Sequence, residues 1–335
     1  YAWRESQILD GKRVMLQGEQ VESADGRERT FYYGPDGKPL ADAFLAAHQK
    51  RWEGVALSVP AGEYHGKAAV FKARLTTGPL SVHLKLTSDQ VLQERLAPLD
   101  LTPIRAEDAA AARSRDKGPL RIGVCRDLPH PIRVDAGHPQ WPAWQTLGDG
   151  TKVLVVRLES PGAQAIRAEI AGLYLPKGAA IFVYNTDDPR EFFGPFDRNN
   201  LPQEDDFWTP SIFSPRISVE FTIPPDQDVA SFRFTIARLA HAYVDVGKLI
   251  SETAVGACEN DVTCHPDWIS TSYAVARISF IDSGSAFLCS GSLVNDLRQT
   301  ARIPYFMTAN HCVGNQTVAA TIEFYWFYQT NTCNG

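Results

Sequence analysis

From residue 119 onward, apolar and polar residues alternate over short segments that end at turn residues. In the clearest segment, Arg216 to Ile223, the apolar residues share one face: Ile217, Val219, Phe221 and Ile223. A period of two residues is typical of β-strands, and a series of such strands indicates two packed sheets. We therefore predict a mainly β chain, with a jelly-roll-like β-sandwich over residues 119–245.

The polar positions of the same segment, Ser218, Glu220 and Thr222, fall on the opposite face. This pattern predicts a sheet that is packed on one side only. The same kind of alternation predicts further strands at residues 152–158, 165–175, 181–184 and 232–236.

Residues 1–118 show a weaker pattern and are predicted to be a small segment of mixed α and β structure. Residues 40–48 have apolar residues at helical spacing, and Ile104 to Asp116 is an alanine-rich, polar segment expected to be a connecting helix. Residues 68–71 and 80–86 are predicted strands, with His83 on the solvent side of the second.

The charge and hydropathy patterns exclude two classes of partner. The chain has 39 acidic and 33 basic side chains, and no run is rich in Lys or Arg. We therefore expect no nucleic-acid partner. No apolar run approaches the roughly 18 residues of a membrane span, so none is predicted. The segment starting at Tyr1 lacks the features of a signal peptide.

The cysteines are unevenly distributed. Of six, five lie after residue 257: Cys258, Cys264, Cys289, Cys312 and Cys333. None forms a C-x-x-C pair, so a disulfide framework in an oxidising compartment is favoured over a zinc site. The alternative is a cytosolic domain with several buried thiols. Cys125 stands apart, as a free buried thiol or as the partner of a later cysteine.

Two groups of residues in the predicted sandwich could bind a ligand. His130 and His138 flank a proline-rich segment that leads to Trp141 and Trp144, and these residues could bind a metal or a sugar. Their spacing matches no metal motif, so packing around the prolines is the default interpretation.

Acidic residues in two loops could bind calcium: Asp187 and Asp188, and the group Glu204, Asp205 and Asp206. Neither group has the spacing of an EF-hand, and acidic loop residues are usually solvated. We therefore assign no metal and no cofactor to the chain.

The carboxyl-terminal part contains a predicted hairpin, 274–281 and 286–294, followed by strands at 303–307 and 321–328. The apolar strand 303–307 leads into Thr308-Ala309-Asn310-His311-Cys312. This arrangement would place His311 at the end of a buried strand, next to a cysteine that a disulfide could hold.

Three segments in this part resemble the bacterial lysyl endopeptidase family: Cys-Ser-Gly-Ser-Leu-Val at 289–294, Tyr-Phe-Met-Thr-Ala-Asn-His-Cys at 305–312, and the aromatic segment from Phe324 to Cys333. The segment from Cys258 to Cys264 resembles the start of the mature enzymes. Residues 207–211 and the following strand resemble, more loosely, the β-rich pro-region of that family.

The resemblance implies the precursor (zymogen) of a secreted, trypsin-like serine endopeptidase, extracellular or periplasmic, with a chymotrypsin-like fold. It also implies a protein or peptide substrate that is cleaved after lysine. His311 would be the catalytic general base. The implied disulfides are Cys289–Cys312 and Cys264–Cys333, and Cys258 would bond a cysteine further downstream.

The resemblance also suggests a division of the chain. Residues 1–118 and 119–245 would form a pro-region that assists folding, inhibits the enzyme and packs on its own protease domain. Residues 246–257 would be a linker with a processing site at Lys248, and residues 258–335 the amino-terminal half of the protease domain.

The Asp and Ser partners of His311 are not found in this sequence. In chymotrypsin-like enzymes they follow the His, and the serines at Ser283-Gly284-Ser285 and Ser290-Gly291-Ser292 precede it. We expect these serines to be structural and the chain alone to be inactive. It is either part of a longer precursor, which we favour because Cys258 lacks a partner, or a natural inactive remnant.

A second function remains open on the sequence alone. The chain could be a secreted β-sandwich protein that binds a glycan or a protein and carries an inactive protease-like remnant. Trp141, Trp144 and Trp208 could serve such binding, although tryptophans of this kind mostly fill sandwich cores.

Overall fold

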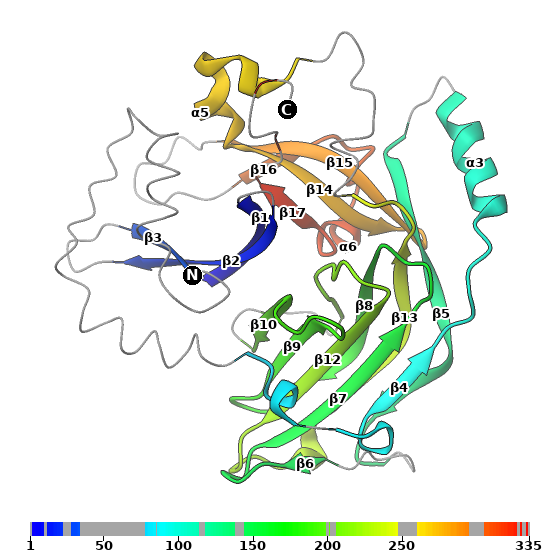
Figure 1. Ribbon diagram of the computed structural model, residues 1–335, viewed down its shortest axis with the longest axis vertical. Helices are drawn as coiled ribbons and strands as arrows, with labels where there is room; N and C mark the ends of the chain where they lie inside the picture. Colours follow the sequence, from blue (N-terminus) through cyan, green and yellow to red (C-terminus); the bar gives the residue numbers. More distant parts are fainter. Residues whose placement is uncertain are drawn as a thin grey trace.

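The computed structural model describes residues 2–9, 12–22, 28–33, 78–84, 86–113, 118–137, 144–198, 201, 206–246, 260–294, 305–326, 329 and 333. The chain is mainly β, as predicted (Figure 1). None of the described helices is long and apolar enough to cross a membrane. The segments at 40–48 and 68–71 and the loop residues Glu204 and Asp205 lie outside the described residues.

The first two sheets are built from strands before residue 224. A three-stranded antiparallel sheet contains β1 (Ala2–Leu9), β2 (Lys12–Glu22) and β3 (Glu28–Tyr33). A six-stranded sheet has the order β10-β9-β12-β7-β4, with β6 paired to β7. Its strands are β4 (Leu92–Arg95), β6 (Gln145–Thr146), β7 (Lys152–Glu159), β9 (Ala180–Asn185), β10 (Phe192–Phe196) and β12 (Arg216–Ile223).

The third sheet has eight strands in the order β11-β8-β13-β5-β15-β14-β17, with β16 paired to β15. Its first four strands in chain order are β5 (Leu120–Val134), β8 (Ala165–Tyr174), β11 (Phe207–Trp208) and β13 (Arg233–Ala242). The others are β14 (Val275–Asp282), β15 (Ser285–Val294), β16 (Tyr305–Thr308) and β17 (Glu323–Trp326).

The six-stranded and eight-stranded sheets pack face to face as the predicted sandwich. Their shared core contains Leu154 and Phe221 from the first sheet and Ile166, Phe234 and Leu239 from the second. Phe221 stacks on Phe234 with ring centroids 4.3 Å apart. Burial of aromatic and branched side chains is the main force that holds such sheets together.

Both faces of β12 are buried, so the prediction of a sheet packed on one side was wrong. Ser218 and Glu220 are 0% exposed. The segment around the 3-10 helix η1 (Leu80–His83) covers this face, and the backbone N–H groups of Leu80 and Ser81 each donate a 2.8 Å hydrogen bond to the Glu220 carboxylate. The strand predicted at 80–86 is therefore wrong as well.

Among the described residues, the helical segments are short except for one. They are η1, η2 (Ser88–Gln90), α3 (Thr102–Arg113), η3 (Val229–Ser231), η4 (Val262–Cys264), η5 (Pro266–Trp268), α5 (Ile269–Ser272) and α6 (Gln316–Ala319). The connecting helix predicted at 104–116 corresponds to α3, which lies on the outside of β5 (Figure 1) and has no buried residue. Arg121 on β5 holds it through a 2.7 Å contact with Asp108.

The eight-stranded sheet continues from the sandwich into the carboxyl-terminal part of the chain. Residues Leu120 to Val124 of β5 pair with β15 on one side, and residues Gly123 to Val134 pair with β13 on the other. Beyond β15 the sheet curls through β14 and β17 and forms half of a barrel above the sandwich (Figure 1). This half-barrel carries the histidine that the sequence singles out.

Candidate active site

His311 lies in a turn at the end of β16. The turn closes through hydrogen bonds from the N–H groups of Cys312 and Val313 to the Ala309 carbonyl oxygen, at 2.9 and 3.1 Å. The Thr308 hydroxyl donates a 2.8 Å hydrogen bond to the Ser290 carbonyl oxygen on β15. The His311 side chain is exposed to solvent, whereas the backbone around it is fixed.

A disulfide holds this turn to the neighbouring strand. Cys289 on β15 is bonded to Cys312, with their Cα atoms 6.2 Å apart. Cys312 is buried in a small cluster with Ile278, Phe280 and Val318. The residue next to His311 is therefore fixed both covalently and by apolar packing, which limits where the imidazole can point.

The close approach of β16 to β15 requires a glycine. A Cβ atom at Gly291 would lie 2.4 Å from the Met307 carbonyl oxygen and 2.4 Å from the Phe306 ring. Residues 290–292 of the Ser-Gly-Ser segment are thus part of a β-strand that supports the histidine turn. The other segment, 283–285, forms the β14–β15 turn, where Ser283 and Gly284 both have positive φ.

The group formed by Cys289, His311 and Cys312 has the donor atoms of a metal site, since their ligand atoms lie within 4.8 Å of one another. The two sulfur atoms are bonded to each other. Zinc binds cysteine as the thiolate, so a disulfide leaves only the imidazole as a strong ligand. This group does not fit a metal centre in its oxidised form.

The second disulfide joins Cys264 and Cys333, whose Cα atoms are 4.5 Å apart. Both disulfides are the pairs implied by the resemblance. Cys125 is a free thiol, and burial raises its pKa to about 11. Cys258 and Lys248 lie outside the described residues.

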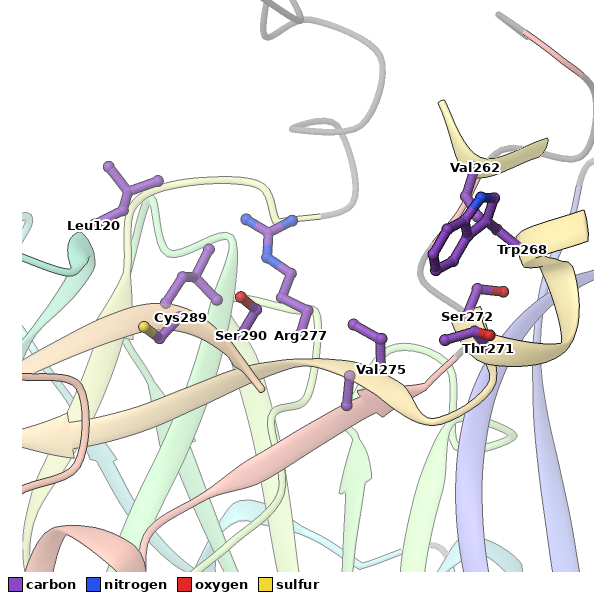
Figure 2. A pocket seen from close by; sticks show the side chains of 11 residues that line it. Leu120, Val262, Trp268, Thr271, Ser272, Val275, Arg277, Cys289 and Ser290 are labelled. Atoms are coloured by element: carbon purple, nitrogen blue, oxygen red, sulfur yellow. The ribbon is translucent and has the colours of Figure 1, made fainter. Parts of the chain in front are cut away.

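An open pocket of about 610 Å³ lies beside the half-barrel, between α5 with its preceding turns and strands β14 and β15. Figure 2 shows Trp268 and Val262 on one side and Cys289, Ser290 and Arg277 on the other. Trp268 is 62% exposed. His311 is not among the lining residues, but Cys289 is, and its sulfur lies within 4.8 Å of an imidazole nitrogen of His311.

A buried polar cluster joins the sandwich to the half-barrel. The Glu323 carboxylate on β17 accepts hydrogen bonds from the Ser211 N–H (2.9 Å), the Ser211 hydroxyl (2.6 Å) and the Tyr325 hydroxyl (2.8 Å). The Ser279 hydroxyl lies 3.3 Å from the same carboxylate. Burial and the nearby Glu323 carboxylate raise the pKa of Tyr325.

Arg167 on β8 makes a second connection. Its guanidinium donates hydrogen bonds to the carbonyl oxygens of Thr209 (2.8 Å) and Thr321 (2.9 Å), and the side chain is 6% exposed. Thr321 in turn accepts a 2.8 Å hydrogen bond from the Ile281 N–H through its hydroxyl. Sequence patterns did not single out these residues, because their partners are far apart in the chain.

The candidate ligand residues of the sandwich have structural partners. His130 on β5 is exposed, with its ring nitrogen 3.3 Å from Glu94. Trp144 packs edge-on against Phe232, with centroids 5.2 Å apart. Trp208 lies beneath the Arg238 guanidinium at 5.6 Å. His138 and Trp141 lie outside the described residues.

The acidic loop residues are also engaged where the structure describes them. Asp187 forms two hydrogen bonds with the guanidinium of Arg216. Asp188 accepts two hydrogen bonds from Arg190, at 2.7 and 2.8 Å. Both carboxylates are therefore paired with arginine side chains.

Comparison with known proteins identifies two family models that match successive parts of the chain. The model described as the lysyl endopeptidase N-terminal domain matches residues 95–243, and the lysyl endopeptidase C-terminal domain matches residues 253–335. A lysyl endopeptidase of Pseudomonas aeruginosa is 25% identical over 244 residues. The alignment covers 69% of this chain and 51% of the relative, so the chain spans about half of that protein's length. No solved structure matches the chain.

Proposed function

Because this chain is a lysyl endopeptidase-like protein, we propose that it is the precursor form of a secreted serine endopeptidase that cleaves after lysine. In this proposal, residues 1–245 are the pro-region, residues 246–257 the linker and residues 258–335 the first half of the protease domain. The comparisons support a protease-related protein. The proposed serine chemistry rests on the position of His311, and the proposed lysine specificity and secretion rest on the resemblance to the family.

The position of His311 is the observation that carries the proposal. The imidazole is exposed at the end of β16, while the adjacent Cys312 is buried and bonded to Cys289. A general base must reach substrate and still keep a fixed orientation. In the complete enzyme, His311 would accept the proton of the serine nucleophile and return it to the leaving amine.

The continuous sheet supports a pro-region that packs on its own protease domain. Strand β5 pairs with β15, and one apolar cluster contains Ile122 and Ala240 from the sandwich together with Ile281, Ala286 and Leu288 from the half-barrel. Arg167 and Glu323 add buried and partly buried hydrogen bonds between the same two parts of the chain. A surface of this kind would hold the protease half in place while the rest of the domain folds.

Processing at Lys248 would separate the two parts. Val246 is buried in the shared cluster, and Lys248 follows two residues later. We propose that the mature protease cuts after this lysine. Replacing Lys248 with Gln in the protein made from its complete gene would then block or redirect maturation, and unchanged processing at the same bond would reject the site.

A fluorophosphonate probe tests the proposed chemistry, because it reacts with the activated serine of this enzyme class. The protein made from its complete gene should be labelled after maturation. Absence of labelling in correctly processed protein would reject the serine endopeptidase and favour the glycan-binding or protein-binding alternative. The packing of the partly buried Trp144 against Phe232 does not support a binding face at that residue.

A further inference from the structure

A buried histidine of the sandwich lies next to the strand junction that joins the two parts. His241 on β13 is 1% exposed, and its Nδ1 atom lies 2.8 Å from the Ser160 hydroxyl. Ser160 follows β7 in the opposite sheet, so this contact links the two sheets of the sandwich. Among the described residues, Nε2 of His241 has no hydrogen-bond partner.

Arg126 fixes the direction of the Ser160–His241 hydrogen bond. Its guanidinium donates to the Ser160 hydroxyl oxygen at 2.9 Å and to the Ala97 carbonyl oxygen at 2.7 Å. The Ser160 proton can therefore be donated to Nδ1 of a neutral imidazole. A protonated His241 would place a second positive charge beside the Ser160 hydroxyl, which already accepts a hydrogen bond from Arg126. The Ser160 proton would then have no acceptor.

The register places His241 directly beside the junction. His241 pairs with Val124 on β5, and Val124 also pairs with Ser285 on β15. Strands β5 and β13 approach each other closely here, since a Cβ atom at Gly123 would lie 2.7 Å from the His241 carbonyl oxygen. A shift of β13 at His241 would therefore be transmitted to the β5–β15 pairing.

The other charged groups on the surrounding elements do not offset a charge on His241. Glu159 at the end of β7 is paired with Arg95 on β4 at 3.2 Å. Arg167 on β8 is directed to Thr209 and Thr321. Burial, with the nearby positive charge of Arg126 as a smaller cause, lowers the pKa of His241 to about 4.

We propose that the Ser160–His241 hydrogen bond is an acid-sensitive latch. It holds the β5–β15 junction closed while His241 is neutral, and proton uptake by His241 favours opening of the junction. Above pH 6.5 the imidazole is neutral in both the folded and the open state. As the pH falls from 6.5 towards 4, the open state gains the proton first, so opening becomes more favourable. A role of this latch in releasing a pro-region rests on the proposed function. The acid-dependent opening of the junction does not depend on that function.

Hydrogen exchange of the full chain at pH 7.5 and pH 5 tests the latch, with rates corrected for the intrinsic effect of pH. The amides of residues 120–125 and 285–288 should lose about 30-fold in protection at pH 5, which follows from the two pKa values. The variant His241→Gln keeps an acceptor for Ser160 and does not titrate, so its protection should change by less than about twofold. His130→Gln, at an exposed histidine of β5, should behave as the wild type.

Protection that is unchanged in the wild type, or that is lost equally in His241→Gln, would overturn the proposal. If His241→Gln does not fold, an NMR titration of the wild-type histidine rings decides the matter. A His241 ring that stays neutral until about pH 4 supports the latch, and one that titrates near pH 6.5 rejects it. These readouts need no protease activity, so failure of the proposed function would leave them interpretable.

Discussion

Arg167 donates a 2.9 Å hydrogen bond to the carbonyl oxygen of Thr321, across a sequence separation of 154 residues. This hydrogen bond joins strand β8 of the sandwich to the segment before β17 of the half-barrel. The contact is buried, and hydrogen bonds to charged groups in such places contribute more than surface pairs.

Replacement of Arg167 by Met should lower the free energy of unfolding by about 2–3 kcal/mol, because two buried carbonyl oxygens lose their donor. Urea unfolding followed by circular dichroism measures this change as a shift of the midpoint. The matched control is Arg190→Met, whose exposed pair with Asp188 should shift the midpoint much less. Equal effects of the two variants would contradict a special role for Arg167.

Tyr325 should make the chain sensitive to alkali. Burial and Glu323 raise the pKa of Tyr325 above its ordinary value of 10, so the folded state disfavours the tyrosinate. Stability is then full below pH 10 and is lost as the pH rises above it, where the unfolded chain ionises first. The variant Tyr325→Phe should unfold with less dependence on pH between 10 and 11. An identical alkaline profile would exclude this tyrosine as the cause.

The disulfide Cys289–Cys312 should stabilise the histidine turn. It closes a loop with a sequence separation of 23, for which chain entropy gives about 3.5 kcal/mol. Replacement of both cysteines by Ser should lower the unfolding midpoint and increase hydrogen exchange at residues 309–313. An increase in exchange that is confined to residues near Cys264 would contradict a stabilising role of the Cys289–Cys312 disulfide at the histidine turn.

Gly291 should not accept any side chain. A methyl group there meets the Met307 carbonyl oxygen at 2.4 Å, so Gly291→Ala should cost about 1–3 kcal/mol and displace the strand that precedes His311. Gly148→Ala is the control, since a Cβ atom at that site has nothing within 4 Å. A thermal melt of both variants distinguishes a local clash from a general effect of alanine.

Much of the sandwich could be predicted because several of its strands alternate apolar and polar residues, β12 most clearly. The predicted strand from Arg216 to Ile223 has the same bounds as β12. The segment from Leu80 to Leu86 was wrongly predicted to be a strand because its apolar and polar residues alternate. In the structure, the N–H groups of Leu80 and Ser81 bind the Glu220 carboxylate. That carboxylate is 140 residues away from Leu80 in the chain.

The site was predictable to a smaller extent. His311 could be identified from its local motif, since the strand, the turn and the cysteine are adjacent in sequence. Arg167, Glu323 and His241 could not, because each acts through partners that only the folded sheets bring together. A polar residue in an apolar strand shows that a partner is needed, but not where the partner lies.

The central claim is that His311 is the general base of a serine endopeptidase, and its replacement in the protein made from the complete gene tests this most directly. We predict that kcat/KM on a lysyl peptide substrate falls by about 10³-fold or more in His311→Ala, while His130→Ala stays at the wild-type value. A His311→Ala enzyme that is folded, processed and as active as the wild type would contradict the account.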